Sequence, residues 1–137
     1  MRIVKNGSSI NSVDAWFATA PPKEAYQWKD GRSAKELAKS FCQPSGVGLP
    51  AEIKSLLDSS PVLGRVDIVE LWPEHKLALD SLRGETRNAD LAGIGTSRLG
   101  PTAITVEAKA DEPFGDTTGQ ALAKAPQRSN LPSRIES

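Results

Sequence analysis

Apolar residues recur at helical spacing over about the first 60 residues of the chain. The clearest predicted helix spans 33–43, where Leu37 and Phe41 share one face. Ser33 and Glu36 have the spacing of a capping box, in which each side chain binds a free backbone amide of the other residue. Prolines and turn residues bound two further predicted helices, at 11–20 and 50–58.

From Val62 onward apolar and polar residues alternate, as they do in strands. Pro73 interrupts this region, so the pattern predicts either two strands or one broken strand around it. The strongest strand candidate contains the β-branched run from Ile104 to Val106, and a turn before it would fold it against the preceding segment. The predicted elements are strands at 65–72, 75–81, 87–97 and 102–110, a helix at 116–125 and the start of another at 130–137. This order predicts a mixed α/β (α+β) fold, with an antiparallel hairpin in a sheet flanked by helices.

Composition narrows the class of protein. The 137 residues suit one domain, and 17 basic residues balance 17 acidic ones, so no overall charge attracts nucleic acid or membranes. The single cysteine, Cys42, can form no internal disulfide, and no stretch reaches the roughly 20 apolar residues of a membrane span. We therefore expect one domain, 1–137, in the reducing cytoplasm and without a membrane partner.

The pattern Glu-x-Lys occurs three times, and its setting decides what it can do. Side chains two residues apart point the same way on a strand but diverge by about 200° on a helix. Glu52 and Lys54 fall in a predicted helix and are interpreted as solvated charges. Glu74 and Lys76 follow Pro73, which is typical of a strand edge or bend, so this pair ranks second.

Glu107 and Lys109 lie in the strongest predicted strand, where an isolated charge costs several kcal/mol unless it is paired or binds a metal. One interpretation is an ion pair on the open face of an antiparallel sheet. The other includes Asp90, which the predicted hairpin would bring beside Glu107. Two protein carboxylates completed by water and phosphate are a usual environment for Mg²⁺. This set predicts a Mg²⁺ or Mn²⁺ site formed by Asp90, Glu107 and the carbonyl of Ala108, with Lys109 stabilising charge on a phosphate.

Other residue types limit the chemistry further. His75 is the single histidine, which excludes a histidine-based metal cluster and a Cys/His nucleophile pair. Gly93 and Gly95 lack the third glycine of a dinucleotide-binding loop. The tryptophans are widely spaced along the chain, which is more typical of core anchors than of a base-stacking platform: Trp16, Trp28 and Trp72.

Asp90, the run Glu107-Ala108-Lys109 after a hairpin, and a helix carrying Gln120 together resemble the core of the PD-(D/E)XK nuclease superfamily. Three longer blocks, GRSAKELAKSF, RNADLAGIG and VEAKADEPFG, resemble an uncharacterised bacterial family thought to belong to this nuclease-like group. The resemblance covers most of the chain. It implies a restriction-endonuclease-like core and a Mg²⁺-dependent phosphodiester hydrolase acting on nucleic acid, with DNA favoured. Asp90, Glu107, Lys109 and Gln120 would be its catalytic residues.

The sequence departs from the superfamily pattern in two places. Asn88-Ala89 stands where a proline usually precedes the first aspartate, which is a frequent variation. The superfamily order also implies a strand and a helix after the one with Gln120, whereas this sequence ends at Ser137. We therefore expect a truncated domain whose sheet is completed in a homodimer or by exchanged elements. The balanced charge favours an alternative, a non-catalytic nuclease-like binding or assembly module.

Overall fold

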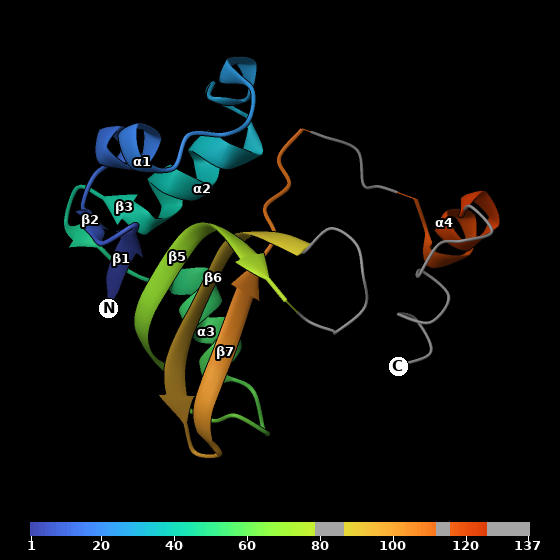
Figure 1. The fold of residues 1–137 in the computed structure, drawn as a ribbon. Helices are drawn as coiled ribbons and strands as arrows, with labels where there is room; N and C mark the ends of the chain where they lie inside the picture. The colour runs from blue at the N-terminus through green and yellow to red at the C-terminus, as the bar shows by residue number, and fades with distance from the viewer. Residues whose placement is uncertain (79–86, 112–115, 126–137) are drawn as a thin grey trace.

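The computed structural model describes residues 1–78, 87–111 and 116–125. Within them a five-stranded mixed sheet has the order β2-β1-β5-β6-β7, and a separate antiparallel pair joins β3 to β4 (Figure 1). The predicted mixed α/β class is therefore confirmed. The helix expected at 130–137 and the end of the strand expected at 75–81 lie outside the described residues. The elements are β1 (Arg2–Lys5), β2 (Ser8–Ile10), α1 (Val13–Thr19), η1 (Ala25–Gln27), α2 (Ser33–Phe41), β3 (Cys42–Gln43), β4 (Gly46–Val47), α3 (Ala51–Asp58), β5 (Asp67–Leu77), β6 (Arg87–Ser97), β7 (Gly100–Val106) and α4 (Thr118–Lys124).

The chain begins with a β-hairpin that the sequence reasoning missed. Asn6 and Gly7 both have positive φ, 51° and 80°, which is the backbone that a two-residue hairpin turn requires. β1 then pairs in parallel with β5, through Arg2 opposite Glu70 and Ile3 opposite Leu71. As a result β5 is an interior strand of the sheet.

The three long strands form an antiparallel meander, as predicted for the second half of the chain. The region around Pro73 is one strand, β5, which continues through the proline with a bend at Glu74, where φ is 48°. β7 ends at Val106 and lies at the edge of the sheet. The prediction that Glu107 and Lys109 lie within a central strand is therefore wrong, because the backbone pairing with β6 ends before Glu107.

The first three helices agree with the predictions in position, but one of their caps differs. Ser33 is the first residue of α2 and Arg32 is its N-cap residue, so the predicted capping box is wrong. The reason is a turn at Gly31, with φ of 83°, which presents the Gly31 amide to the Glu36 carboxylate at 2.9 Å. In α1, Ser12 caps the helix by accepting the Ala15 amide at 3.1 Å.

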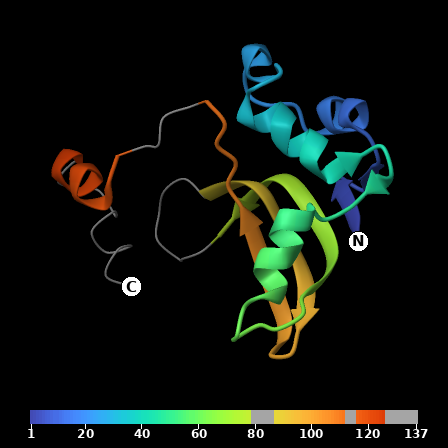
Figure 2. The same ribbon diagram turned by 180° about the vertical axis from the view of Figure 1, so that it is seen from behind.

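The core lies between the helices and one face of the sheet. α2 contributes the fully buried Ala38 and Phe41, which join Ile3, Leu71 and Leu91 of three neighbouring strands. α3 covers the side seen in Figure 2, in front of β6 and β7. In both views α4 lies apart from the sheet (Figures 1 and 2). No helix among the described residues is long and apolar enough to cross a membrane.

Candidate active site

The bend in β5 sets the position of Glu74. Pro73 lacks an amide hydrogen, and a non-glycine residue with positive φ such as Glu74 costs on the order of 1–3 kcal/mol. Lys5 of β1 offsets this cost, because its Nζ donates to the carbonyl oxygens of Pro73 at 2.7 Å and Glu74 at 2.8 Å. The Glu74 carboxylate is held in turn by the side-chain amide of Asn88 at 2.6 Å. The bend is therefore fixed from both neighbouring strands.

Asp90 lies between the acidic residues of the two flanking segments. In the register of β5 and β6, Pro73 is opposite Leu91 and His75 is opposite Ala89. Asp90 therefore lies across from Glu74. On the other side Leu91 and Val106 form the last pair of β6 with β7, so Glu107 is the next residue along from that pair. The Asp90 Oδ2 atom accepts the backbone amide of Ala108 at 2.7 Å. This bond ties the segment after β7 to β6.

Glu107 and Lys109 face each other just beyond the end of β7. The Lys109 Nζ is 4.0 Å from the Glu107 Oε1, and their side chains are 39% and 61% exposed, so the attraction between them is screened by water. The pKa of Glu107 is raised, first by partial burial and next by the negative charge of Asp90, with Glu74 adding to it. Lys109 and Arg87 act in the opposite direction. The acidic groups therefore repel one another, which is the condition that a bound cation relieves.

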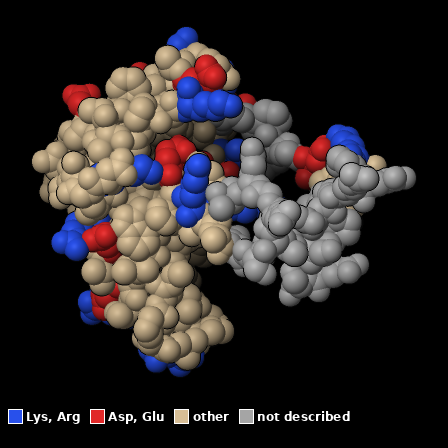
Figure 3. All heavy atoms as spheres, in the orientation of Figure 1, with Lys and Arg blue, Asp and Glu red and all other residues tan. Residues whose placement is uncertain are grey.

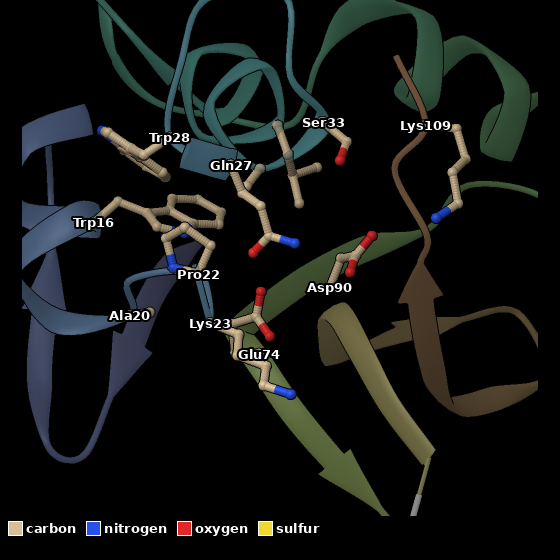
Figure 4. Close-up of a pocket in the computed structure, with 12 residues that line it drawn as sticks. Trp16, Ala20, Pro22, Lys23, Gln27, Trp28, Ser33, Glu74, Asp90 and Lys109 are labelled. Carbon is tan, nitrogen blue, oxygen red and sulfur yellow. The ribbon is translucent and has the colours of Figure 1, made fainter. Parts of the chain in front are cut away.

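A cleft of about 280 Å³ brings part of this set together. Glu74, Asp90 and Lys109 line it, and Figure 4 shows the two carboxylates on the same side of the strands with the amine directed toward Asp90. Glu107 lines two neighbouring hollows, one of them against α2 and α3. The structure thus places Glu107 beside the cleft. It places Glu74, from the Glu-x-Lys pair that ranked second in the sequence, inside the cleft.

Gln120 lies away from the cleft, whereas Ala108 lies beside Asp90. Gln120 lies in the first turn of α4, where its Oε1 accepts the Thr117 amide at 2.9 Å and completes a capping box. It lines none of the hollows around Asp90. Ala108 presents its amide to the Asp90 carboxylate. The role expected for its carbonyl, as a metal ligand, stays a prediction.

The prediction that the tryptophans are core anchors is confirmed for Trp16 and Trp28. Trp16 is 3% exposed and belongs to the core, and Trp28 packs against that core. Both also line the cleft opposite the carboxylates, although twelve sequence positions separate them. The one local signal between them was the double proline Pro21-Pro22, which follows the end of α1.

The acidic residues suit a hard cation that keeps much of its water. Among the residues that the structure describes, no three histidine, cysteine or acidic side chains converge closely enough to hold a metal by themselves. Mg²⁺ is commonly bound by one or two carboxylates together with waters and substrate phosphates. Asp90 with Glu107 or Glu74 provides such a pair, since one Asp90 oxygen remains after the bond to Ala108.

Comparison with protein families gives one match, Domain of unknown function (DUF6946), over residues 9–137. The chain belongs to this family. No curated protein and no solved structure matches the chain. Any inference about activity therefore rests on the residues around the cleft.

Proposed function

We propose that this chain is a metal-dependent phosphodiester hydrolase of the PD-(D/E)XK type that acts on nucleic acid. One observation carries the proposal: Glu74, Asp90 and Lys109 line a single cleft, and Glu107 lies at its side with a raised pKa. This arrangement combines paired carboxylates with an amine, as hydrolysis of a phosphodiester requires. The resemblance of Asp90 and the run Glu107-Ala108-Lys109 to the PD-(D/E)XK pattern supports the same proposal.

Each residue then has a distinct task. A bound Mg²⁺ or Mn²⁺ would supply a Lewis acid for the phosphate and lower the pKa of a coordinated water. Asp90, oriented by the Ala108 amide, and one glutamate of the Glu74 and Glu107 pair would hold the cation. Lys109 would bind a phosphate oxygen and stabilise the charge that develops there. The two glutamates compete for the same task, so variants must separate them.

The test measures cleavage of labelled DNA and RNA with Mg²⁺ and with Mn²⁺. Lys109→Met should keep the thermal stabilisation that the metal provides and lose cleavage by about 100-fold or more. Asp90→Asn should lose both. Lys76→Met is the matched control, because Lys76 belongs to the other strand-borne Glu-x-Lys pair and is exposed. Comparing Glu74→Gln with Glu107→Gln then identifies the second metal-binding acid.

The competing function is a non-catalytic binding or assembly module with the same fold. The zero net charge favours it, and the face in Figure 3 shows acidic and basic side chains interspersed without a continuous basic surface. A wild-type protein that cleaves neither DNA nor RNA with either metal would establish this alternative. Equal cleavage by wild type and Asp90→Asn would show that the activity comes from elsewhere.

Partner and compartment follow as parts of the same proposal. Among the described residues nothing pairs with the outer edge of β7, and an uncovered edge is a template for a second copy of the chain. We place the protein in the cytoplasm as a homodimer joined at this edge. Light scattering that gives the mass of one chain at high concentration would refute the dimer.

A further inference from the structure

The cleft has an apolar wall that phosphodiester chemistry does not use. The carboxylates come from β5 and β6, whereas the opposite side comes from α1, α2 and the segment between them (Figure 4). That wall consists of two indole rings and aliphatic groups: Trp16, Ala20, Pro22, Trp28 and Leu37. A site for a bare phosphate needs no such surface, because phosphate is bound by charges and amides. The wall therefore indicates a ligand with a flat apolar part next to its phosphate.

Packing against neighbouring side chains holds the two indole rings of this wall in place. The Trp28 ring stacks on Phe17 with centroids 5.0 Å apart and an angle of 29° between the planes. Trp16 is fixed in the core. Rigid rings lose little conformational freedom when a planar group stacks on them, which favours binding. Trp16 is only 3% exposed, so the partly exposed Trp28 ring is the one that a planar group can reach.

A polar group stands between the two walls. The Gln27 Oε1 accepts the backbone amide of Glu24 at 3.0 Å, which fixes the side chain in the capping box of η1. Its amide nitrogen keeps two donor hydrogens, and Figure 4 shows the amide in the space between Trp28 and Asp90. Carbonyl oxygens and ring nitrogens of nucleobases are acceptors for such donors. The cleft therefore offers stacking and a hydrogen bond to one base.

We propose that the cleft binds one unpaired nucleotide, with its base against the Trp28 ring and its phosphate at Lys109. The inference rests on the proposed hydrolysis and adds the substrate class, which is single-stranded nucleic acid. A volume of about 280 Å³ lies at the lower end of small-molecule sites, which suits one nucleotide and excludes a base pair. A base inside a duplex cannot reach the wall unless it leaves the stack.

The charge distribution leads to the same substrate. Lys23 and Lys109 are the two cations that line the cleft, so few phosphates are neutralised on binding. For about two phosphate contacts on a single strand, the logarithm of affinity should fall with the logarithm of salt concentration with a slope of about −1.4. A protein that held a duplex along its backbone would show a much steeper dependence. Binding must therefore draw on the base as well as the phosphate.

The test measures affinity in EDTA, so that no cleavage occurs. A labelled single strand of about eight nucleotides is compared with the same sequence in a duplex, by fluorescence anisotropy. The single strand should bind at least about tenfold more tightly. Trp28→Ala should weaken binding of the single strand by about tenfold or more, because stacking of one base on an aromatic ring contributes about 1–3 kcal/mol. Tyr26→Ala is the matched control, because Tyr26 is 58% exposed, lies two residues away and does not line the cleft.

A second variant guards against misfolding of Trp28→Ala. Ala34→Phe, on the α2 side of the cleft, fills the space and leaves the stacked pair intact, so it should also abolish preference for the single strand. Equal affinity for the duplex, no binding of either form, or equal loss in Tyr26→Ala and Trp28→Ala would overturn the inference. Tight single-strand binding without cleavage would support this site and refute the hydrolase. Cleavage of duplex DNA at an equal rate by wild type and Trp28→Ala would support the hydrolase and refute this nucleotide site.

Discussion

Replacing Gly95 with alanine tests how closely β5 and β6 must approach to hold the site. Gly95 is buried in β6 opposite Ile68. A Cβ atom added there would lie 2.5 Å from the carbonyl oxygen of Asp67 and 2.9 Å from the Cα of Ile68, whereas ordinary contact begins at 3.4 Å. Both obstacles are backbone atoms, so no side chain can rotate away. The two strands would have to separate or shift.

The expected cost follows from these distances. Overpacking a tightly packed interior costs typically about 1–3 kcal/mol. The replacement also removes about 0.5–1 kcal/mol of backbone entropy from the unfolded chain, which acts in the opposite direction. Because the clash is with fixed backbone, we expect a net loss of about 2 kcal/mol in the free energy of unfolding. The control is Gly48→Ala, where nothing lies within 4 Å of the added Cβ and φ is not positive.

Urea unfolding followed by circular dichroism gives the comparison. The midpoint for Gly95→Ala should fall by about 1 M relative to wild type, with the slope unchanged. Gly48→Ala should match wild type or exceed it slightly. If the midpoint of Gly95→Ala equals that of Gly48→Ala, the close approach of β5 and β6 at this point is wrong, and so is the register that carries Glu74 and Asp90 to the same end of the sheet.

Three further variants test the site and its supports. Glu107→Gln should make the fold more stable than wild type at pH 7 and should lose this advantage near pH 4. The native pKa of Glu107 is raised, so the stability of the wild type falls as pH rises above the ordinary value of 4.5, and urea unfolding at both pH values measures this. Lys5→Met should lower the free energy of unfolding by about 1–3 kcal/mol, because the partly buried carbonyl oxygens of Pro73 and Glu74 lose their hydrogen-bond donor. The same variant should weaken metal-induced stabilisation, because it releases the bend that positions Glu74. Ser12→Ala should cost about 1 kcal/mol through loss of the α1 cap and leave metal binding unchanged.

Local patterns in the sequence predicted the elements and one contact of the site. The hairpin of β6 and β7 follows from a turn at Ser97–Gly100 between two β-branched or alternating segments, and its register places Asp90 next to the Glu107 segment. That adjacency depends on a short loop, which is why sequence spacing captures it. The hairpin at Asn6-Gly7 carried an equally local signal, since Asn-Gly between alternating residues is typical of such turns. It was missed although it was visible.

Glu74 could not be identified in the same way. Its position depends on the bend after Pro73, and that bend is held by Lys5, which lies nearly seventy residues earlier in the chain. A pattern of apolar and polar residues contains no information about contacts at such separation. Gly93 and Gly95 make the same point: they resembled part of a nucleotide loop, but both allow close approach of β5 to β6.

The cleft occurs where two strand pairings of the sheet end, that of β1 with β5 and that of β6 with β7. β1 pairs with β5 only as far as Ile3, and β7 stops at Val106, so backbone groups of the following residues lack strand partners. Side chains take their place, with Lys5 binding the carbonyls after Pro73 and Asp90 binding the Ala108 amide. Each of these bonds also fixes a charged group at the cleft. If these bonds hold the segment after Pro73 and the segment after β7 as one unit, Asp90→Asn and Lys5→Met should each reduce the protection of backbone amides from exchange in both segments, at Glu74 and at Ala108. Protection lost at only one of the two would show that the segments are held independently.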